Sequence, residues 1–210
     1  MKKVPHLLGK ALRETGQAVD RLGLSIAGNE VFRETLSRHR TVMPISVDRC
    51  PSVSSSSFIA PNASVIGNVH IGDDASIWYG TILRADKADS SSIKIGKGSN
   101  IQDRSVLTGE ITVGENVTIG HGALMNEKVS IGDNCLIGQG SVCSANVTIE
   151  SNCILGAGAV VLPGTTIPSG QMWAGNPAAF IRDCTSQEIS AITTQSAGYV
   201  KHGKDHSAAY

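Results

Sequence analysis

The sequence predicts an all-β chain wound into a left-handed parallel β-helix, a triangular prism of hexapeptide repeats. The first observation is a period of six: an apolar residue recurs at every sixth position from Ile59 to Ile167, and sixteen of these nineteen positions are Ile, Leu or Val. The second is a smaller residue four positions later, as at Ala63, Ser105 and Ser141. The third is the glycine that often follows the apolar residue and relieves crowding at the corners.

Each hexapeptide supplies one short strand and one corner, so three of them complete a coil of 18 residues. Residues 18 apart therefore stack on the same face, roughly 4.8 Å from one another. The phase breaks only at Asp89, inside the polar segment 84–92, which we expect to bulge outward. An ordinary β-sandwich or barrel would instead give strands at irregular spacing. The 18-residue spacing thus predicts which side chains share a face.

The composition excludes several classes of protein. The chain has 210 residues and a net charge of zero, which argues against a dedicated nucleic-acid binder. It contains no run of 18 apolar residues, and residues 1–40 lack the apolar core of a secretory signal. Of the five cysteines, Cys135 and Cys153 are 18 apart and are interpreted as buried thiols in a reducing compartment. Whether a transit peptide was removed stays open.

Residues 1–40 are expected to form a helical docking segment. Residues 5–24 have the pattern of an amphipathic helix, with Leu8, Leu12, Val19 and Leu22 near one stripe, and a second short helix is expected over 30–38. Residues 1–40 carry eight Lys or Arg against four Asp or Glu. The helix either packs on its own domain or docks to a membrane surface or a partner. Residues 41–57, rich in proline and serine, are expected to be a connector.

The prism itself is expected over residues 58–172, followed by a cap and a C-terminal helix over 173–200. The run from Trp173 to Ala178 closes the open end of the prism, which otherwise exposes a sheet edge. The helix begins at Thr185, where Thr185 and Glu188 have the spacing of a capping box. Residues 201–210 are expected to be a loose tail.

Several short motifs lie at fixed places in this pattern. Five belong to the prism: Trp78-Tyr79-Gly80, Leu83-Arg84-Ala85-Asp86, Asn100-Ile101-Gln102-Asp103, Asn116-Val117-Thr118-Ile119-Gly120-His121 and Gly175-Asn176-Pro177-Ala178. Together they resemble the γ-class carbonic anhydrases. The N-terminal runs 13–18, 20–23 and 32–40 are similar to those of the mitochondrial γ-carbonic anhydrase and carbonic anhydrase-like subunits of plant and algal respiratory complex I.

The resemblance implies a trimer that holds zinc between neighbouring subunits with three histidines, two from one subunit and one from its neighbour. These three ligand positions fall on Thr108, His121 and Asn126 in this sequence. A threonine hydroxyl and an asparagine amide are poor zinc ligands. Because Thr108 and Asn126 are 18 apart, they are expected to stack on one face. We therefore expect no catalytic residue and no zinc site made by this chain alone, and no enzyme activity of its own.

Other residues match positions that shape the site in the family. Arg84, Asp86 and Gln102 are expected to be remnants of that site or part of a trimer interface. His121 stacks over Asp103 on a different face, and Asp103 is a candidate for orienting the imidazole ring. His121 either completes a zinc site whose other histidines belong to a neighbouring subunit or is only hydrogen-bonded at the interface.

Three functions stay open from the sequence. The first is a structural or assembly subunit, a catalytically degenerate member of a heterotrimer on the matrix side of the inner mitochondrial membrane, with other γ-carbonic anhydrase subunits and complex I membrane-arm subunits as partners. The second is a CO₂-hydrating heterotrimer in which His121 serves a neighbour's zinc. The third is a hexapeptide acyltransferase with His121 as general base. Nucleic acid is not an expected partner.

Overall fold

The computed structural model describes residues 3–27, 40–46, 48–87 and 91–208, in two compact units that are treated separately. The first unit contains helix α1 (Lys3–Ala27), which includes the amphipathic helix predicted over 5–24 and continues beyond Gly23. Six of its large apolar side chains are described, and they are 60–78% exposed: Leu7, Leu8, Leu12, Val19, Leu22 and Ile26. The second predicted helix, over 30–38, lies outside the described residues.

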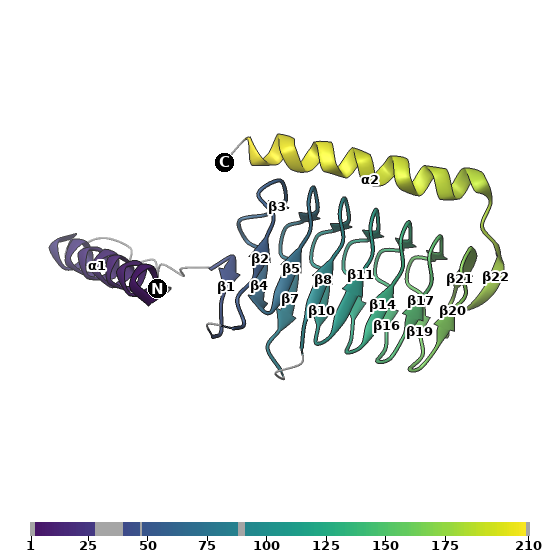
Figure 1. Cartoon of the computed structure of the whole chain (residues 1–210), viewed down its shortest axis with the longest axis horizontal. Coiled ribbons are helices and arrows are strands. Elements are labelled where there is room, and N and C mark those ends of the chain that lie inside the picture. The colour runs from purple at the N-terminus through teal and green to yellow at the C-terminus, as the bar shows by residue number, and fades with distance from the viewer. Residues whose placement is uncertain (1–2, 28–39, 47, 88–90, 209–210) are drawn as a thin grey trace. The chain divides into compact units, whose positions relative to one another are not determined.

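The second unit is an all-β parallel solenoid with a C-terminal helix, as predicted (Figure 1). Sheet A contains β1 (Val42–Met43), β4 (Ser64–Gly67), β7 (Ile82–Ala85), β10 (Val106–Thr108), β13 (Leu124–Met125), β16 (Val142–Cys143) and β19 (Val160–Val161). Sheet B contains β2 (Ser52–Val53), β5 (Val69–Ile71), β8 (Ile93–Ile95), β11 (Ile111–Val113), β14 (Val129–Ile131), β17 (Thr148–Ile149) and β20 (Thr166–Ile167).

Sheet C contains β3 (Phe58–Ile59), β6 (Ser76–Ile77), β9 (Asn100–Ile101), β12 (Thr118–Ile119), β15 (Leu136–Ile137), β18 (Ile154–Leu155), β21 (Gln171–Ala174) and β22 (Ala179–Asp183). From β1 to β21, strands that follow one another along the chain lie in different sheets, and each pairs with the strand one coil away. Residues 41–57, expected as a connector, contain β1 and β2, which each add one strand to a sheet.

The register follows the predicted spacing. Leu107 pairs with Met125 and Ile119 with Ile137, an offset of 18 residues in each case. Across the predicted bulge the offset is 24 residues, because Leu83 pairs with Leu107. The strands on either side of the six extra residues keep their register. Within the segment expected to bulge, residues 88–90 lie outside the described residues.

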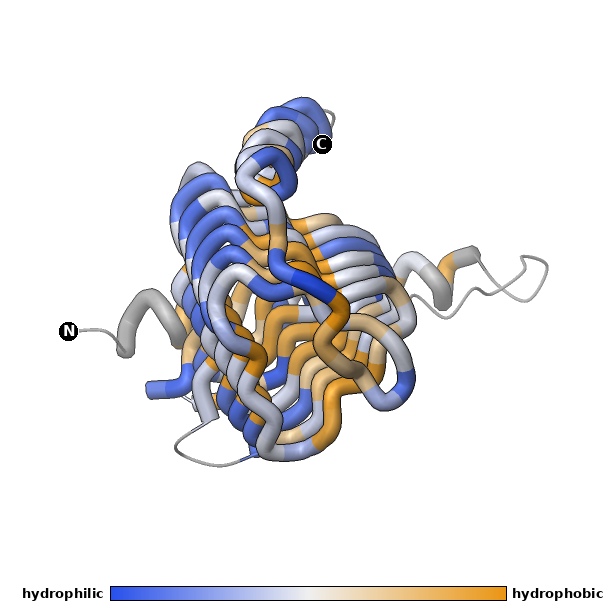
Figure 2. Tube along the Cα trace, turned by 90° about the vertical axis from the view of Figure 1, so that its right-hand side faces the viewer, coloured by the Kyte–Doolittle hydropathy of each residue, from blue (hydrophilic) through white to orange (hydrophobic). Residues whose placement is uncertain are grey.

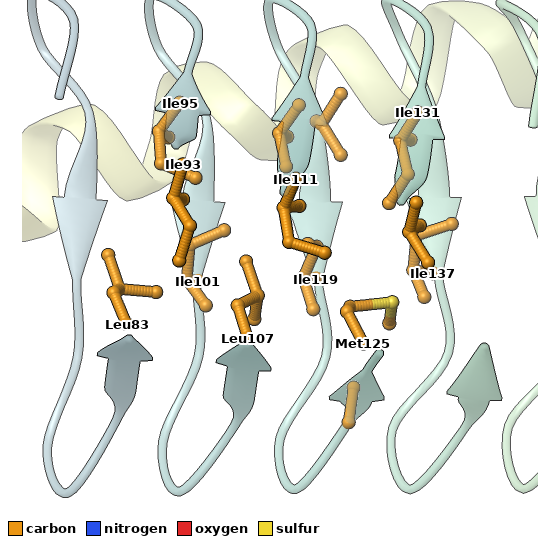
Figure 3. Packing of buried hydrophobic residues seen from close by; sticks show 14 of the residues in the cluster. Leu83, Ile93, Ile95, Ile101, Leu107, Ile111, Ile119, Met125, Ile131 and Ile137 are labelled. Carbon is orange, nitrogen blue, oxygen red and sulfur yellow. The ribbon is translucent and has the colours of Figure 1, made fainter. Parts of the chain in front are cut away.

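The interior is formed by the sixth-position residues stacked in columns. Figure 2 shows the hydrophobic residues lining the inside of the prism, and Figure 3 shows the side chains of successive coils lying next to one another. Leu83, Ile101, Leu107, Ile119 and Met125 are all 0% exposed. Burying one such side chain favours folding by about 1.5–3 kcal/mol, so the columns are the main source of stability.

The two predicted buried thiols lie in this interior. Cys135 and Cys153 are free and 0% exposed. The Cys135 thiol donates to the carbonyl of Glu150 at 3.1 Å, and the Cys153 thiol donates to the carbonyl of Pro168 at the same distance. The hydrogen bond with Cys153 and burial raise the pKa of Cys135 above its ordinary value. These thiols act as small core residues.

The outer faces of the three sheets differ in polarity. Sheet A carries an apolar row in register, formed by Ile82, Val106, Leu124, Val142 and Val160. Sheet B carries only polar side chains in the corresponding row: His70, Lys94, Thr112, Ser130, Thr148 and Thr166. Helix α2 (Ser186–Ser207) contacts β3, β6, β9 and β12 of sheet C. The outer face of sheet B is therefore polar and suited to contact with solvent. The outer face of sheet C is covered by α2, and that of sheet A presents apolar side chains.

Helix α2 is longer than the sequence suggested. It continues through residues 201–207, which were expected as a loose tail, because its last turns pack on aromatic side chains. The ring of His206 lies 5.1 Å from that of Trp78 and 5.7 Å from that of Phe58, and its Nδ1 is 2.8 Å from the hydroxyl of Tyr79. Near the helix centre, Ser196 donates to the carbonyl of Gly98 at 2.6 Å.

The chain leaves the prism through a hairpin. Strand β21 pairs with β18 and so continues sheet C, and β22 pairs antiparallel with β21 at the edge. The predicted capping box follows: Thr185 accepts from the backbone N–H of Glu188, and the Glu188 carboxylate accepts from the backbone N–H of Thr185. Arg182 also donates to both oxygens of Glu188, at 2.9 and 2.6 Å.

These contacts predict an acid-sensitive start of α2. The hydrogen bonds from Arg182 and Thr185 lower the pKa of Glu188 from 4.5 to about 2. A lowered folded-state pKa stabilises the fold above the unfolded pKa, and this contribution is lost as the pH falls from about 4.5 to about 2. Glu188→Gln should therefore lower the melting temperature at pH 7 and leave it almost unchanged near pH 2. Equal destabilisation at both pH values would contradict this; Gln187→Glu, which adds a carboxylate beside Glu188, is the control.

Candidate functional site

The predicted site residues lie mainly at the two corners that flank sheet A. The histidine corner precedes the strands of this sheet and comprises Asn62, Tyr79, Asp103, Arg104 and His121. The threonine corner lies at the C-terminal ends of the same strands and comprises Arg84, Asp86, Thr108, Asn126 and Glu127. Strand β13 lies between His121 and Asn126. The structure therefore does not bring the three predicted ligand positions, Thr108, His121 and Asn126, together within one chain.

Asp103 and His121 meet at the histidine corner. They occupy adjacent coils, and Nδ1 of His121 lies 3.3 Å from Oδ2 of Asp103. The other carboxylate oxygen accepts from the backbone N–H of Tyr79 at 3.0 Å, which fixes the carboxylate. A carboxylate beside Nδ1 favours the tautomer with a proton on Nδ1 and a lone pair on Nε2. Since the His121 side chain is 51% exposed, Nε2 is accessible to a ligand or a proton.

A hollow of about 620 Å³ opens at this corner. It is lined by Asn62, Tyr79, Gly80, Asp103, Arg104, His121 and Gly122. Asn62 accepts from the backbone N–H of Gly80 at 3.0 Å, and Gly122 donates to the backbone carbonyl of Asp103 at 2.8 Å. The lining thus combines one guanidinium, one imidazole and one carboxylate with neutral polar groups.

Thr108 and Asn126 lie one coil apart at the threonine corner. Their preceding residues, Leu107 and Met125, are paired in register, so the backbone places both residues at the ends of neighbouring strands. Both are half-buried. Arg84 pairs in register with Thr108 on the other side. The stacking inferred from the 18-residue spacing is therefore present in the backbone.

Arg84 and Asp86 form an ion pair beside them. Nε of Arg84 donates to Oδ2 of Asp86 at 2.7 Å. Within the described residues, Oδ1 of Asp86 is buried and has no hydrogen-bond partner. A buried acceptor of this kind is suited to a donor from another molecule. Lys87 and Glu127 lie nearby, with Nζ and Oε1 3.8 Å apart.

Gln102 belongs to neither the histidine corner nor the threonine corner. It is 5% exposed, under helix α2, and donates to the side-chain oxygen of Asn100 at 3.3 Å. Its amide also hydrogen-bonds Tyr199 of α2. Burial and the charge of Asp103 raise the pKa of Tyr199, and the bond from Gln102 opposes part of this rise. In this protomer Gln102 joins α2 to the prism.

The donor set at the threonine corner does not fit zinc. Zinc in proteins prefers thiolate, imidazole or carboxylate ligands. The two residues in the predicted ligand positions, Thr108 and Asn126, offer a hydroxyl and an amide, and the Asp86 carboxylate is already engaged by Arg84. In the parts of the chain that the structure describes, no three His, Cys, Asp or Glu residues lie close enough to hold a metal ion.

Three further residues were not among the predicted site residues. Asn62 and Arg104 line the hollow beside His121, and Tyr199 of α2 hydrogen-bonds Gln102 and lies within the electrostatic influence of Asp103. Arg104 could have been found from the sequence, because the 18-residue spacing stacks it against Gly122. Tyr199 could not, because its position depends on how α2 packs.

The Asp103–His121 contact predicts the protonation pattern of the imidazole ring. Nitrogen-15 NMR of neutral His121 should show a proton on Nδ1 and none on Nε2. Asp103→Asn should reverse this pattern, since an amide NH₂ facing Nδ1 can only donate. Gln139→Ala, one coil further along the same corner, should leave the ring unchanged. An identical tautomer in the wild type and the Asp103→Asn variant would contradict the assignment.

Comparison with known proteins agrees with this architecture. The family described as hexapeptide repeat of succinyl-transferase matches residues 128–167, and bacterial transferase hexapeptide (six repeats) matches residues 110–145. A solved hexapeptide transferase family protein from Anaplasma phagocytophilum is 38% identical and has a TM-score of 0.73, covering 79% of this chain and 97% of that one. These matches support the hexapeptide-repeat solenoid fold.

Similarities that extend beyond the hexapeptide repeats are more specific. The chain is 43% identical to gamma carbonic anhydrase 1, mitochondrial, of Arabidopsis thaliana, over 97% of this chain and 76% of that protein. It is 38% identical to gamma carbonic anhydrase 2, mitochondrial, of the same plant, over 97% of this chain and 75% of that protein. It is also 44% identical to gamma carbonic anhydrase-like 1, mitochondrial, over 73% of this chain and 63% of that protein. The family predicted from the motifs is thus confirmed: the chain belongs to the γ-carbonic anhydrases.

Proposed function

We propose that this protein is a structural or assembly subunit, a γ-carbonic anhydrase that has lost its own catalytic site. The observation that carries this proposal is the threonine corner, where Thr108 and Asn126 occupy inherited ligand positions. Without imidazoles there, this face does not supply the Lewis acid that lowers the pKa of a bound water to about 7. The prism remains complete because neither side chain belongs to the buried columns.

The outer face of sheet A supports assembly with similar subunits. Its apolar row begins at Ile82, which is 37% exposed, and ends at Val160. A neighbouring prism seated on this face would bury the row and lie against the flanking corners. It would also offer donors to the buried Oδ1 of Asp86. A trimer formed in this way is the arrangement that the family resemblance implies.

We place this trimer in mitochondria, as a heterotrimer on the matrix side of the inner membrane attached to the membrane arm of complex I. The support is the likeness to γ-carbonic anhydrases that are mitochondrial by name, together with the N-terminal motifs. In such a heterotrimer, this chain holds the subunits together while chemistry is left to its neighbours.

A second candidate is that His121 is a ligand to a neighbour's zinc. The contact with Asp103 favours it, because metal-bound histidines commonly donate their other ring N–H to a carboxylate. Nε2 would then face the neighbour, whose own two histidines would complete the site. In this arrangement the heterotrimer hydrates CO₂ and this chain supplies one ligand.

Acyl transfer is a third candidate. His121 with Asp103 resembles a general base with its orienting carboxylate. The matched repeat families are named after transferases, but they describe a fold that supports several activities. Their names therefore do little to decide between acyl transfer and the γ-carbonic anhydrase candidates. The full-length likenesses favour the γ-carbonic anhydrase candidates.

Helix α1 is proposed to dock on the membrane surface. Its stripe includes Leu8, Leu12, Val19 and Leu22, all exposed. A helix with an apolar face and basic residues can lie in the interface of an anionic bilayer. None of the described helices is long and apolar enough to span a membrane, so this contact would be peripheral.

The zinc prediction tests the leading proposal. The purified wild-type chain should carry no stoichiometric zinc by elemental analysis. Thr108→His combined with Asn126→His should raise the zinc content toward one per chain, because His121 of a neighbouring copy can supply the third imidazole. Thr112→His combined with Ser130→His, paired in register on sheet B, is the matched control and should bind no stoichiometric zinc. One zinc per wild-type chain would refute the loss of the site.

The membrane prediction tests α1. The full chain should float with vesicles of phosphatidylcholine and phosphatidylglycerol. Leu8→Glu with Leu12→Glu should lower partitioning by at least roughly tenfold, because two buried leucines are lost. Arg13→Gln with Gln17→Glu makes the same change in charge on the opposite side of the helix and should reduce partitioning less. Equal loss in both variants would show that charge, and not the apolar stripe, drives binding.

A further inference from the structure

We propose that the hollow at the histidine corner binds a small monoanionic carboxylate, with Arg104 as the residue that holds it. This goes beyond the proposed assembly role and does not depend on it, because every residue used belongs to this chain. The inference rests on the backbone of Arg104, on the path of its side chain and on the charges around it.

The backbone of Arg104 has a conformation that arginine seldom adopts. Its φ is +58°, in the left-handed region. Seven residues other than glycine have positive φ among those described, and five of them are the residues that tolerate it best: Asp74, Asn116, Asn134, Asn146 and Asn152. The same corner uses glycine in other coils, at Gly80, Gly122, Gly140 and Gly158. A non-glycine outlier at a corner with a hollow points to a function for the side chain.

The side chain of Arg104 lies over the hollow. Its Cγ is 3.5 Å from the place that a Cβ on Gly80 would occupy, so the side chain passes over the neighbouring coil. It lines the same hollow as His121. Among the described residues, its guanidinium has no carboxylate within ion-pair distance. The planar fork of arginine matches the two oxygens of a carboxylate.

Neighbouring groups define the charge of the ligand. The Asp103 carboxylate is already engaged by the Tyr79 N–H and lies against His121. Its negative charge still disfavours a dianion such as phosphate near pH 7. Asn62 accepts from Gly80 through Oδ1, so its NH₂ group is the end left to donate. One guanidinium and one amide donor, next to one compensated carboxylate, suit a monoanion.

The test is a titration of the nitrogen-15-labelled full chain with sodium acetate at constant ionic strength, followed by NMR. We expect saturable shifts of the Gly80 and Gly122 amides and of the Arg104 side-chain N–H. Inorganic phosphate at the same ionic strength should bind more weakly than acetate. Sodium chloride should give no saturable change. Equal binding of acetate and phosphate would overturn the assignment of a monoanion.

Arg104→Asn is the decisive variant. Asparagine suits the left-handed backbone, so the variant should melt at or above the wild-type temperature. Its acetate dissociation constant should rise roughly tenfold or more, since the charge-assisted pair is lost. Lys128→Asn removes one positive charge at another position of positive φ, +57°, and should leave the constant within about twofold.

The Arg104→Lys variant separates the contribution of the planar guanidinium geometry from that of the positive charge. Lysine keeps the charge but cannot bind both oxygens in one plane, so acetate binding should fall between the wild type and Arg104→Asn. Wild-type binding in Arg104→Asn, an equal loss in Lys128→Asn, or no saturable shift in the wild type would each overturn the proposal. None of these results bears on zinc, so the assembly role stands or falls separately.

Discussion

The constraint on which this structure depends is the length of one coil. Eighteen residues return the chain to the same face of the prism, and each strand from β1 to β21 pairs with the strand one coil away. The inward residue of each hexapeptide therefore packs on its counterparts above and below, as Leu107 does on Leu83 and Met125. The six extra residues between β7 and β8 are tolerated because the register is kept on both sides of them.

The same constraint separates stability from chemistry. Leu107 and Met125 are completely buried, whereas the residues that follow them, Thr108 and Asn126, turn toward the corner. Exchanging an outward ligand removes little from the buried columns. A member of this family can therefore lose a metal site and keep the prism that its neighbours need. The apolar face of sheet A, between two polar corners, is what such a scaffold has to retain.

At the histidine corner Asp103 and His121 meet, and Arg104 adds a positive charge beside them. These residues lie at the edge of the face on which we place a neighbouring subunit. Metal sharing and carboxylate binding use different atoms, Nε2 of His121 in one case and the Arg104 guanidinium in the other. Either can be present without the other.

Local spacing in the sequence predicted the sheets, the stacked interior, the capping box at Thr185 and the pairing of Asp103 with His121. It did not predict the features that depend on how separate elements pack. The last turns of α2 are ordered by rings contributed by Phe58, Trp78 and Tyr79. Gln102 looked like a site residue but lies under the same helix. Strand β1 does not follow the period, because Val42 pairs with Val65, 23 residues further along the chain. Strand β2 does follow it, since Val53 pairs with Ile71, but the prolines and serines of residues 41–57 favoured a connector.

The most direct test of the central claim is the density at each contact between subunits, in a cryo-electron microscopy structure of the assembly purified from its source. We predict no metal where Thr108 and Asn126 face a neighbour, and metal, if present, only where His121 meets two histidines of another subunit. Metal density bounded by Thr108 and Asn126 would contradict the account, and so would a register in which these two residues are not one coil apart.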